Sequence, residues 1–281
     1  MSRRRLLPAP GSSHSSVHPE SPVDEDFEKE LGELEEDLED RKTLTKGIKS
    51  ISFIKVSDIK ERKLFLIPHP ITKKNGKNLI LDLDQTLIYT TDDSSKIDKL
   101  KIFDDSSNMS IKQRVYMIKI FSDKRSKEIN MGGFERDDLQ EFLSFIYDNF
   151  SFIGVWTAAE DDYGKQICHS IFRNIPIPVV IWSRKMCERE DGGYIKPLSK
   201  MIVMNKQYGL TMKNTLIIDD TEETFVKNRE NALKIPAYRP DLDLKTLSTK
   251  DTCLKKIMNY FSSQKFIDSQ DVRMLNSRKL F

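Results

Sequence analysis

The chain has 281 residues, of which 38% are hydrophobic and 9% aromatic, enough to bury a core over most of its length. Its 46 Lys and Arg nearly balance its 44 Asp and Glu, so the net charge is +2, and a dedicated nucleic-acid binder with a basic excess is not expected. Three cysteines without a CxxC pair favour a reducing compartment, and no apolar run is long enough to span a membrane, so we expect no membrane contact.

The first part of the chain differs in composition from the rest. Residues 1–23 are rich in Ser, Pro and Arg, and residues 24–43 are strongly acidic, so we expect residues 1–45 to form a disordered, acidic segment. A short amphipathic helix that docks on a partner is the alternative, although isolated helices of this length are marginal in water. It would use apolar residues at helical spacing: Phe27, Leu31, Leu34 and Leu38. Residues 46–281 are predicted to form one globular domain.

Three short apolar runs in this domain are typical of buried parallel strands: 79–81, 152–156 and 216–218. Helical patterns lie between them, over 139–146, 167–172 and 199–208. Strands that alternate with helices predict an α/β fold, a Rossmann-like parallel sheet with helices on both faces. Each run ends at a polar residue, namely Asp82, Thr157 and Asp219. Since ligands bind beyond the carboxyl ends of such strands, these residues mark the candidate site.

Residues 91–130 interrupt the alternation. Residues 115–121 alternate as a strand does, and residues 122–126 resemble a turn. We expect a small antiparallel insertion near the site, a flap that gates substrate; a surface hairpin without a function is the alternative. No segment is long enough for a large cap.

The strongest motif is Asp82-Leu83-Asp84-Gln85-Thr86-Leu87, directly after the first strand. A carboxylate at a strand end can attack phosphorus, and a second one two residues later can protonate the leaving oxygen and then activate water. The Thr86 hydroxyl can hold the loop. Asp241-Leu242-Asp243 has the same spacing, but it follows Pro240 rather than a strand, so we expect a capped turn or a helix start there.

Phosphoryl transfer also needs positive charge and hydrogen-bond donors around the phosphate. Asp219 and Asp220 can supply a carboxylate that joins Asp82 on Mg²⁺, which prefers few carboxylates and several waters. Thr157 offers a hydroxyl, and Lys196 offers a cation. The sequence predicts Mg²⁺ as the cofactor.

Four ordered motifs resemble those of the haloacid dehalogenase superfamily, and more narrowly the small phosphatases that act on the carboxy-terminal domain of RNA polymerase II (Fcp/Scp-like, NLI-interacting-factor-like). They are Asp82 to Leu87, Trp156-Thr157-Ala158-Ala159, Tyr194-Ile195-Lys196-Pro197-Leu198 and Ile217-Ile218-Asp219-Asp220. The resemblance covers roughly residues 75–276. Asp137 and Pro197 depart from residues common in the family, and this affects expected substrate contacts only.

The resemblance implies a role for each matching residue. Asp82 is the implied nucleophile and a metal ligand, and Asp84 is the implied general acid/base, which binds metal through its carbonyl. Asp220, which stands where many small members carry Asn, is an implied metal ligand. The remaining implied residues are Thr86, Thr157 and Lys196 for the phosphate, with Asp219 and Arg184 in support.

Together these features predict a Mg²⁺-dependent protein serine/threonine phosphatase with an aspartyl-phosphate intermediate. Its expected partner is a phosphoprotein, the polymerase carboxy-terminal domain or a similar chain, with no direct nucleic-acid contact. A catalytically weak binding module and a small-molecule or polynucleotide 3′-phosphatase are the alternatives. We expect the protein in the nucleus or cytoplasm, and the resemblance favours the nucleus.

Overall fold

The computed structural model describes residues 75–105, 108–122, 127–275 and 280–281. The predicted disordered segment over 1–45, the predicted start of the domain at residue 46 and most of the predicted turn, residues 123–126, lie outside the described residues. Among the helices of the described part, none has both the length and the apolar composition needed to cross a membrane.

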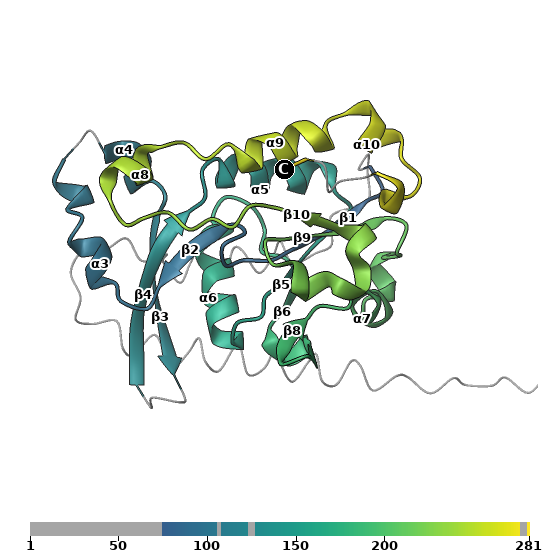
Figure 1. Cartoon of the computed structure of the whole chain (residues 1–281), viewed down its shortest axis with the longest axis horizontal. Coiled ribbons are helices and arrows are strands. Elements are labelled where there is room, and N and C mark those ends of the chain that lie inside the picture. Colours follow the sequence, from purple (N-terminus) through teal and green to yellow (C-terminus); the bar gives the residue numbers. More distant parts are fainter. Residues whose placement is uncertain (1–74, 106–107, 123–126, 276–279) are drawn as a thin grey trace, which may run out of the picture. The chain divides into compact units, whose positions relative to one another are not determined.

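A five-stranded parallel sheet forms the centre of the domain (Figure 1). Its strand order is β10-β9-β1-β5-β6, and β1 pairs with β5 on one side and with β9 on the other. The strands are β1 (Asn78–Leu81), β5 (Phe152–Trp156), β6 (Val180–Trp182), β9 (Thr215–Asp219) and β10 (Ala232–Lys234). The three predicted apolar runs are therefore the three central strands of the sheet, and their carboxyl ends lie at one edge.

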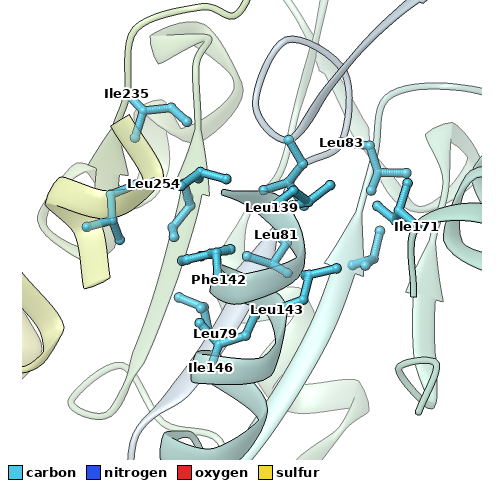
Figure 2. Close-up of a cluster of buried hydrophobic side chains, with 14 of the residues drawn as sticks. Leu79, Leu81, Leu83, Leu139, Phe142, Leu143, Ile146, Ile171, Ile235 and Leu254 are labelled. Atoms are coloured by element: carbon cyan, nitrogen blue, oxygen red, sulfur yellow. The ribbon is translucent and has the colours of Figure 1, made fainter. Parts of the chain in front are cut away.

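Both faces of the sheet are covered by helices. Successive side chains of a strand point to opposite faces, so each strand contributes to two apolar clusters. Leu79 and Leu81 of β1 pack with α5 (Leu139–Asn149) in one apolar cluster (Figure 2). Ile80 packs in a second cluster with residues of α7 (Leu198–Met204). All of β1 is buried, which explains its uninterrupted apolar sequence. The predicted fold class is confirmed.

Further helices complete the two layers. α6 (Asp161–Ile171) and α9 (Cys253–Phe261) belong to the same cluster as α5. The predicted helix over 199–208 is wrong in one respect: it ends at Met204, and a separate 3-10 turn, η4, covers Lys206–Tyr208. Asn205 leaves the helical conformation, with φ −124° and ψ 32°, and its side chain donates to the Met201 carbonyl at 3.0 Å, so the helix is capped there. The remaining helices of this part are α8 (Leu244–Ser248), α10 (Gln264–Asp268), η5 (Glu222–Asn231) and η6 (Val272–Met274).

The segment after β1 forms an antiparallel three-stranded sheet of order β2-β4-β3, which we call the flap sheet. Its strands are β2 (Ile88–Thr91), β3 (Val115–Ser122) and β4 (Lys127–Glu135). The predicted strand over 115–121 and the antiparallel insertion are confirmed. Short helices between β2 and β3 were not predicted: α3 (Ser95–Asp98), η1 (Ile102–Asp104) and α4 (Met109–Lys112).

A two-stranded hairpin carries the predicted lysine. The strands β7 (Glu188–Glu190) and β8 (Gly193–Ile195) are joined by Asp191 and Gly192. The hairpin follows the 3-10 turn η3 (Arg184–Met186). Both joining residues have positive φ, the conformation of the tight hairpin turn that Asp-Gly favours. The hairpin ends at Lys196, directly after β8.

The second Asp-x-Asp sequence forms a helix start, as predicted. Asp243 precedes α8, and its carboxylate accepts a hydrogen bond from the Thr246 amide at 2.9 Å. This is the geometry of an N-cap, so the spacing of two aspartates alone does not identify a catalytic loop.

Candidate active site

Asp82 lies immediately beyond β1, at the centre of the carboxyl edge of the sheet. Its amide continues the strand ladder by donating to the Ile218 carbonyl at 3.0 Å, so its position is fixed by β1 and β9. The Lys196 ammonium donates to Asp82 Oδ1 at 2.5 Å and to Asp219 Oδ2 at 2.7 Å. All three side chains are buried. The hairpin and two strand ends thus bring one cation and two carboxylates together.

Asp219 and Asp220 differ in what holds them. Asp219 ends β9, and besides Lys196 its oxygens accept hydrogen bonds from the Thr221 amide and the Thr224 hydroxyl, at 2.9 and 2.8 Å. Asp219 therefore anchors the lysine. Asp220 is half-buried, and its contact with the loop at 82–87 is Thr86, whose hydroxyl donates to Asp220 Oδ1 at 3.3 Å.

Asp84 is held by hydroxyl groups rather than by a cation. Tyr163 of α6 donates to Asp84 Oδ1, and the Thr90 hydroxyl of β2 donates to the same oxygen at 3.2 Å. Burial raises the pKa of Asp84, while these two hydrogen bonds act in the opposite direction. A carboxyl with a raised pKa holds its proton more readily, which suits a general acid.

The site holds four carboxyl groups near one lysine, those of Asp82, Asp84, Asp219 and Asp220. Crowding and burial disfavour the ionised forms of Asp82, Asp84 and Asp220. Burial raises the pKa of Asp82 to about 8, although Lys196 opposes this. Burial lowers the pKa of Lys196, but Asp219 and Asp82 outweigh that effect and leave it raised, so the lysine stays charged. Burial, followed by the charge of Asp219, also raises the pKa of Asp220.

A divalent cation fits this arrangement. Carboxylate oxygens of Asp82, Asp219 and Asp220 lie within 4.8 Å of one another. Asp82 and Asp220 are the better candidates for ligands, because the buried Asp219 accepts three hydrogen bonds of 2.7–2.9 Å, one of them from Lys196. Asp220 is half-buried and accepts from two threonine hydroxyls at 3.3 Å. The excess of carboxylates over lysine at this site, together with an all-oxygen donor set, matches what Mg²⁺ prefers.

The loop from Asp82 to Leu87 is shaped by two features outside the motif's carboxylates. Gln85 has a φ of 61°, a left-handed conformation that reverses the chain between Asp84 and Thr86. The fully buried Arg136 donates to the Thr86 carbonyl at 3.1 Å and pairs with Asp251 at 2.9 Å. Arg136 therefore ties this loop to the segment before α9.

Two predicted residues lie beside this cluster without direct contact to it. Thr157 follows β5, and its hydroxyl accepts a hydrogen bond from the Ala159 amide at 3.0 Å. Arg184 donates to the Ala158 carbonyl at 2.7 Å and so braces the loop after β5. In the described part of the chain, no hydrogen bond joins either side chain to the carboxylates.

Sequence reasoning missed the roles of Thr90, Tyr116 and Arg136. Thr90 and Tyr116 lie in strands whose pairing places them near Asp84, and their spacing along the chain gives no sign of it. Arg136 pairs with Asp251, 115 residues away, so no local pattern reveals it. Tyr163 carries a weak signal, since it follows the motif at 156–159 within one helical turn of the start of α6.

Comparison with known proteins gives one consistent result. The family model of the NLI interacting factor-like phosphatases matches residues 77–273. A CTD nuclear envelope phosphatase 1 homolog of Caenorhabditis elegans is 26% identical over 215 residues, which are 76% of this chain and 76% of that protein. A putative CTD phosphatase-like protein 355R of Invertebrate iridescent virus 3 is 29% identical over 195 residues, 66% of this chain and 95% of that protein.

A solved structure has the same fold. The structure of Fcp1, described as an essential RNA polymerase II CTD phosphatase, superimposes with a TM-score of 0.55 at 14% sequence identity. The match covers 78% of this chain and 72% of the Fcp1 chain.

Proposed function

Since the chain belongs to the family of NLI interacting factor-like phosphatases, and so to the phosphoric monoester hydrolases, we propose that it dephosphorylates phosphoserine or phosphothreonine in proteins through a covalent phosphate on Asp82. The observation that carries this proposal is the pairing of two unlike carboxylates on one loop. Asp82 is bound by the buried Lys196, while Asp84, two residues later, is bound by hydroxyl groups. Lys196 favours the ionised form of Asp82 that a nucleophile needs, and a bound cation would favour it further, whereas the raised pKa of Asp84 suits a proton donor.

In the first step, a carboxylate oxygen of Asp82 attacks phosphorus and forms the new O–P bond. The bond from phosphorus to the substrate's bridging oxygen breaks, and this oxygen takes the proton of Asp84. Lys196 offers charge to the transferred phosphoryl oxygens, which gain negative character in the transition state. The dephosphorylated serine or threonine then leaves.

In the second step, a water molecule attacks the phosphorus of the aspartyl-phosphate. Asp84, now ionised, takes the proton of the water as the new bond forms. The bond between phosphorus and Asp82 breaks, which regenerates the carboxylate and releases inorganic phosphate. Asp84 is protonated again, so the cycle closes without a further reactant.

We assign Mg²⁺ to Asp82 and Asp220, with the Asp84 carbonyl as a third protein ligand. When bound, the ion neutralises charge on a phosphate oxygen and on the two carboxylates. The residues of this chain do the rest: Thr86 holds Asp220, and Asp219 holds Lys196. We propose that Thr86, Thr157 and Lys196 bind the phosphate and that Arg184 supports the loop carrying Thr157.

The metal assignment predicts how Asp220 variants respond to Mg²⁺. Activity is expected to vanish in excess chelator and to return with Mg²⁺, whereas Ca²⁺ should restore little because its coordination is larger and looser. Asp220→Asn keeps an oxygen ligand but loses a charge, so it should need more Mg²⁺ for half-maximal activity. Asp220→Ala loses the ligand and should need still more or be inactive.

A Mg²⁺ titration of turnover in the wild type and both variants measures this series. Asp243→Asn, which removes a carboxylate from the cap of α8, is the matched control and should titrate as the wild type does. Equal half-saturation in all four proteins would remove Asp220 from the metal site. Full activity in chelator would contradict the metal requirement itself.

A macromolecular substrate is supported by the shape of the domain. The insertion after β1 is the flap sheet with three short helices, and in the described residues no larger domain covers the strand ends. The names of the relatives point to the carboxy-terminal domain of RNA polymerase II. We propose that polymerase domain, or a similar phosphoprotein, as the partner of this protein.

The substrate class is tested by comparing kcat/KM on a phosphoserine peptide of the polymerase repeat, a nucleoside monophosphate and a 3′-phosphorylated oligonucleotide. The phosphopeptide is expected to be the best substrate. A preference for the oligonucleotide would identify a polynucleotide 3′-phosphatase instead, and no turnover on any of the three would favour a binding module.

We propose a nuclear or cytoplasmic location. The described cysteines, Cys168, Cys187 and Cys253, are all free thiols, as expected of a protein in a reducing compartment. Residues 46–281 are proposed as the catalytic domain, since the family match lies within this range.

A further inference from the structure

Three hydroxyl groups from three different elements meet at Asp84. They are Thr90 of β2, Tyr116 of β3 and Tyr163 of α6. The Thr90 oxygen lies 2.5 Å from the hydroxyl oxygen of each tyrosine. Both hydrogen bonds that reach the Asp84 side chain, from Tyr163 and from Thr90, end on Oδ1. Within the described part of the chain, none ends on Oδ2.

The protons of these hydroxyls can be assigned. An ionised carboxylate only accepts hydrogen bonds, so Tyr163 donates to Asp84 in that state, and the Thr90 proton is shared between Asp84 Oδ1 at 3.2 Å and the Tyr163 oxygen at 2.5 Å. Tyr116 can donate to the Tyr89 carbonyl, 3.0 Å away, or to the Thr90 oxygen. A phenol hydroxyl keeps its proton at neutral pH, so each tyrosine remains a donor. Every hydroxyl proton thus has an acceptor, and Oδ2 is left for the substrate.

A glycine makes this arrangement possible. Gly133 of β4 lies between the two flap strands, with Thr90 opposite it in β2 and Tyr116 opposite it in β3. A Cβ atom at this position would come within 2.6 Å of the Tyr116 hydroxyl and 1.8 Å of the Tyr89 carbonyl oxygen. The two hydroxyls therefore meet across a strand position that has no side chain.

We propose that Tyr163 and Thr90 are positioning residues that fix Oδ1 of Asp84, so that Oδ2 carries the proton to the leaving oxygen, and that Tyr116 orients Thr90. The proposal rests on the general acid role proposed for Asp84. In the first step, the bond between Oδ2 and its proton breaks as the bridging oxygen leaves phosphorus and accepts that proton. The hydroxyls exchange no proton; they hold the carboxyl plane. Through Thr90 and Tyr116 the flap sheet is thereby linked to the proton donor.

The test compares two substrates that differ in their need for a proton. An alkyl phosphate such as a phosphoserine peptide needs protonation of its leaving oxygen, whereas p-nitrophenyl phosphate hardly does. Tyr163→Phe and Thr90→Val should each lower kcat/KM on the phosphopeptide by about tenfold, less than the ~10²–10⁴-fold lost with a general acid itself, and lower it much less on the aryl ester, because kcat/KM reports the first step and not the water attack that both substrates share. KM should change little. Thr90→Ser keeps the hydroxyl and should retain the wild-type rate.

A double-mutant cycle with Asp84→Asn shows whether the hydroxyls act through Asp84. Tyr163→Phe should cause no further loss once Asp84 is replaced. Tyr260→Phe, which removes a hydroxyl that bonds the Leu275 carbonyl away from the site, is the control and should leave both rates unchanged. Thermal unfolding of each variant checks the fold.

The outcomes distinguish a failure of the positioning role from a failure of the general acid role of Asp84. Equal losses on both substrates, or a full additional loss in the Asp84→Asn background, would overturn the positioning role. Wild-type turnover by Asp84→Asn would instead overturn the general acid assignment in the proposed function.

Discussion

Replacement of Asp82 by Asn is expected to abolish turnover while the protein still folds. The amide is nearly isosteric with the carboxylate, but it is a poor nucleophile, and loss of a nucleophile lowers kcat by something on the order of 10⁶-fold. The fold should persist because burial already disfavours the charge of Asp82, raising its pKa to about 8, and the amide oxygen can still accept from Lys196. Steady-state assays with both substrates, alongside circular dichroism and thermal unfolding, measure the two effects.

The control for this variant is Asp241→Asn, which changes the first aspartate of the second Asp-x-Asp sequence, at the start of α8. It should leave turnover unchanged. Mg²⁺-dependent turnover by purified Asp82→Asn above a no-enzyme blank would contradict the assignment of the nucleophile.

Replacement of Lys196 by Met should reduce both activity and stability. Lys196 is fully buried between Asp82 and Asp219, and its removal leaves two buried carboxylates without their counter-charge. Breaking a buried ion pair from one side costs about 3–5 kcal/mol of unfolding free energy. Loss of a charged donor to the transferred phosphate should lower kcat by roughly 10²–10³-fold.

Chemical denaturation and turnover at saturating Mg²⁺ measure these two losses. Lys227→Met is the control, since Lys227 pairs with Glu188 and Glu190 on the exposed side of the same hairpin. Exposed pairs of this kind contribute about 0–1 kcal/mol, so the control should behave as the wild type. A Lys196→Met protein with unchanged stability and rate would remove the lysine from the site.

The central sheet could be predicted because its strands are buried on both faces. The runs at 79–81, 152–156 and 216–218 are uninterrupted apolar sequence, and each is followed by a residue with chemical capability. Parallel strands place their carboxyl ends at one edge, so the meeting of Asp82, Asp219 and Asp220 follows from the strands alone. The two Asp-x-Asp sequences could also be told apart, because only the one at 82–84 follows an apolar strand, while the one at 241–243 precedes α8.

Partners that lie far apart in the chain could not be predicted. Tyr163 and Asp84 are separated by 79 residues, and Arg136 and Asp251 by 115. Their meeting depends on how α6 and the segment before α9 pack on the sheet, which no local pattern encodes. The flap sheet was only partly foreseen, because β2 has four residues and begins directly after the motif at 82–87, so it gives no strand pattern of its own.

A phosphate bound to Asp82 is the intermediate that distinguishes the proposed mechanism from direct attack of water on the substrate. Asp84→Asn is the protein in which to trap it, because an aryl phosphate can leave without a proton donor while water attack, which needs the base, becomes slow. The variant should therefore accumulate the acyl phosphate. Borohydride reduces such a group to an alcohol, so mass spectrometry of the digested protein should find homoserine at position 82. Homoserine at another position, or an unmodified position 82 during continued turnover, would contradict the mechanism.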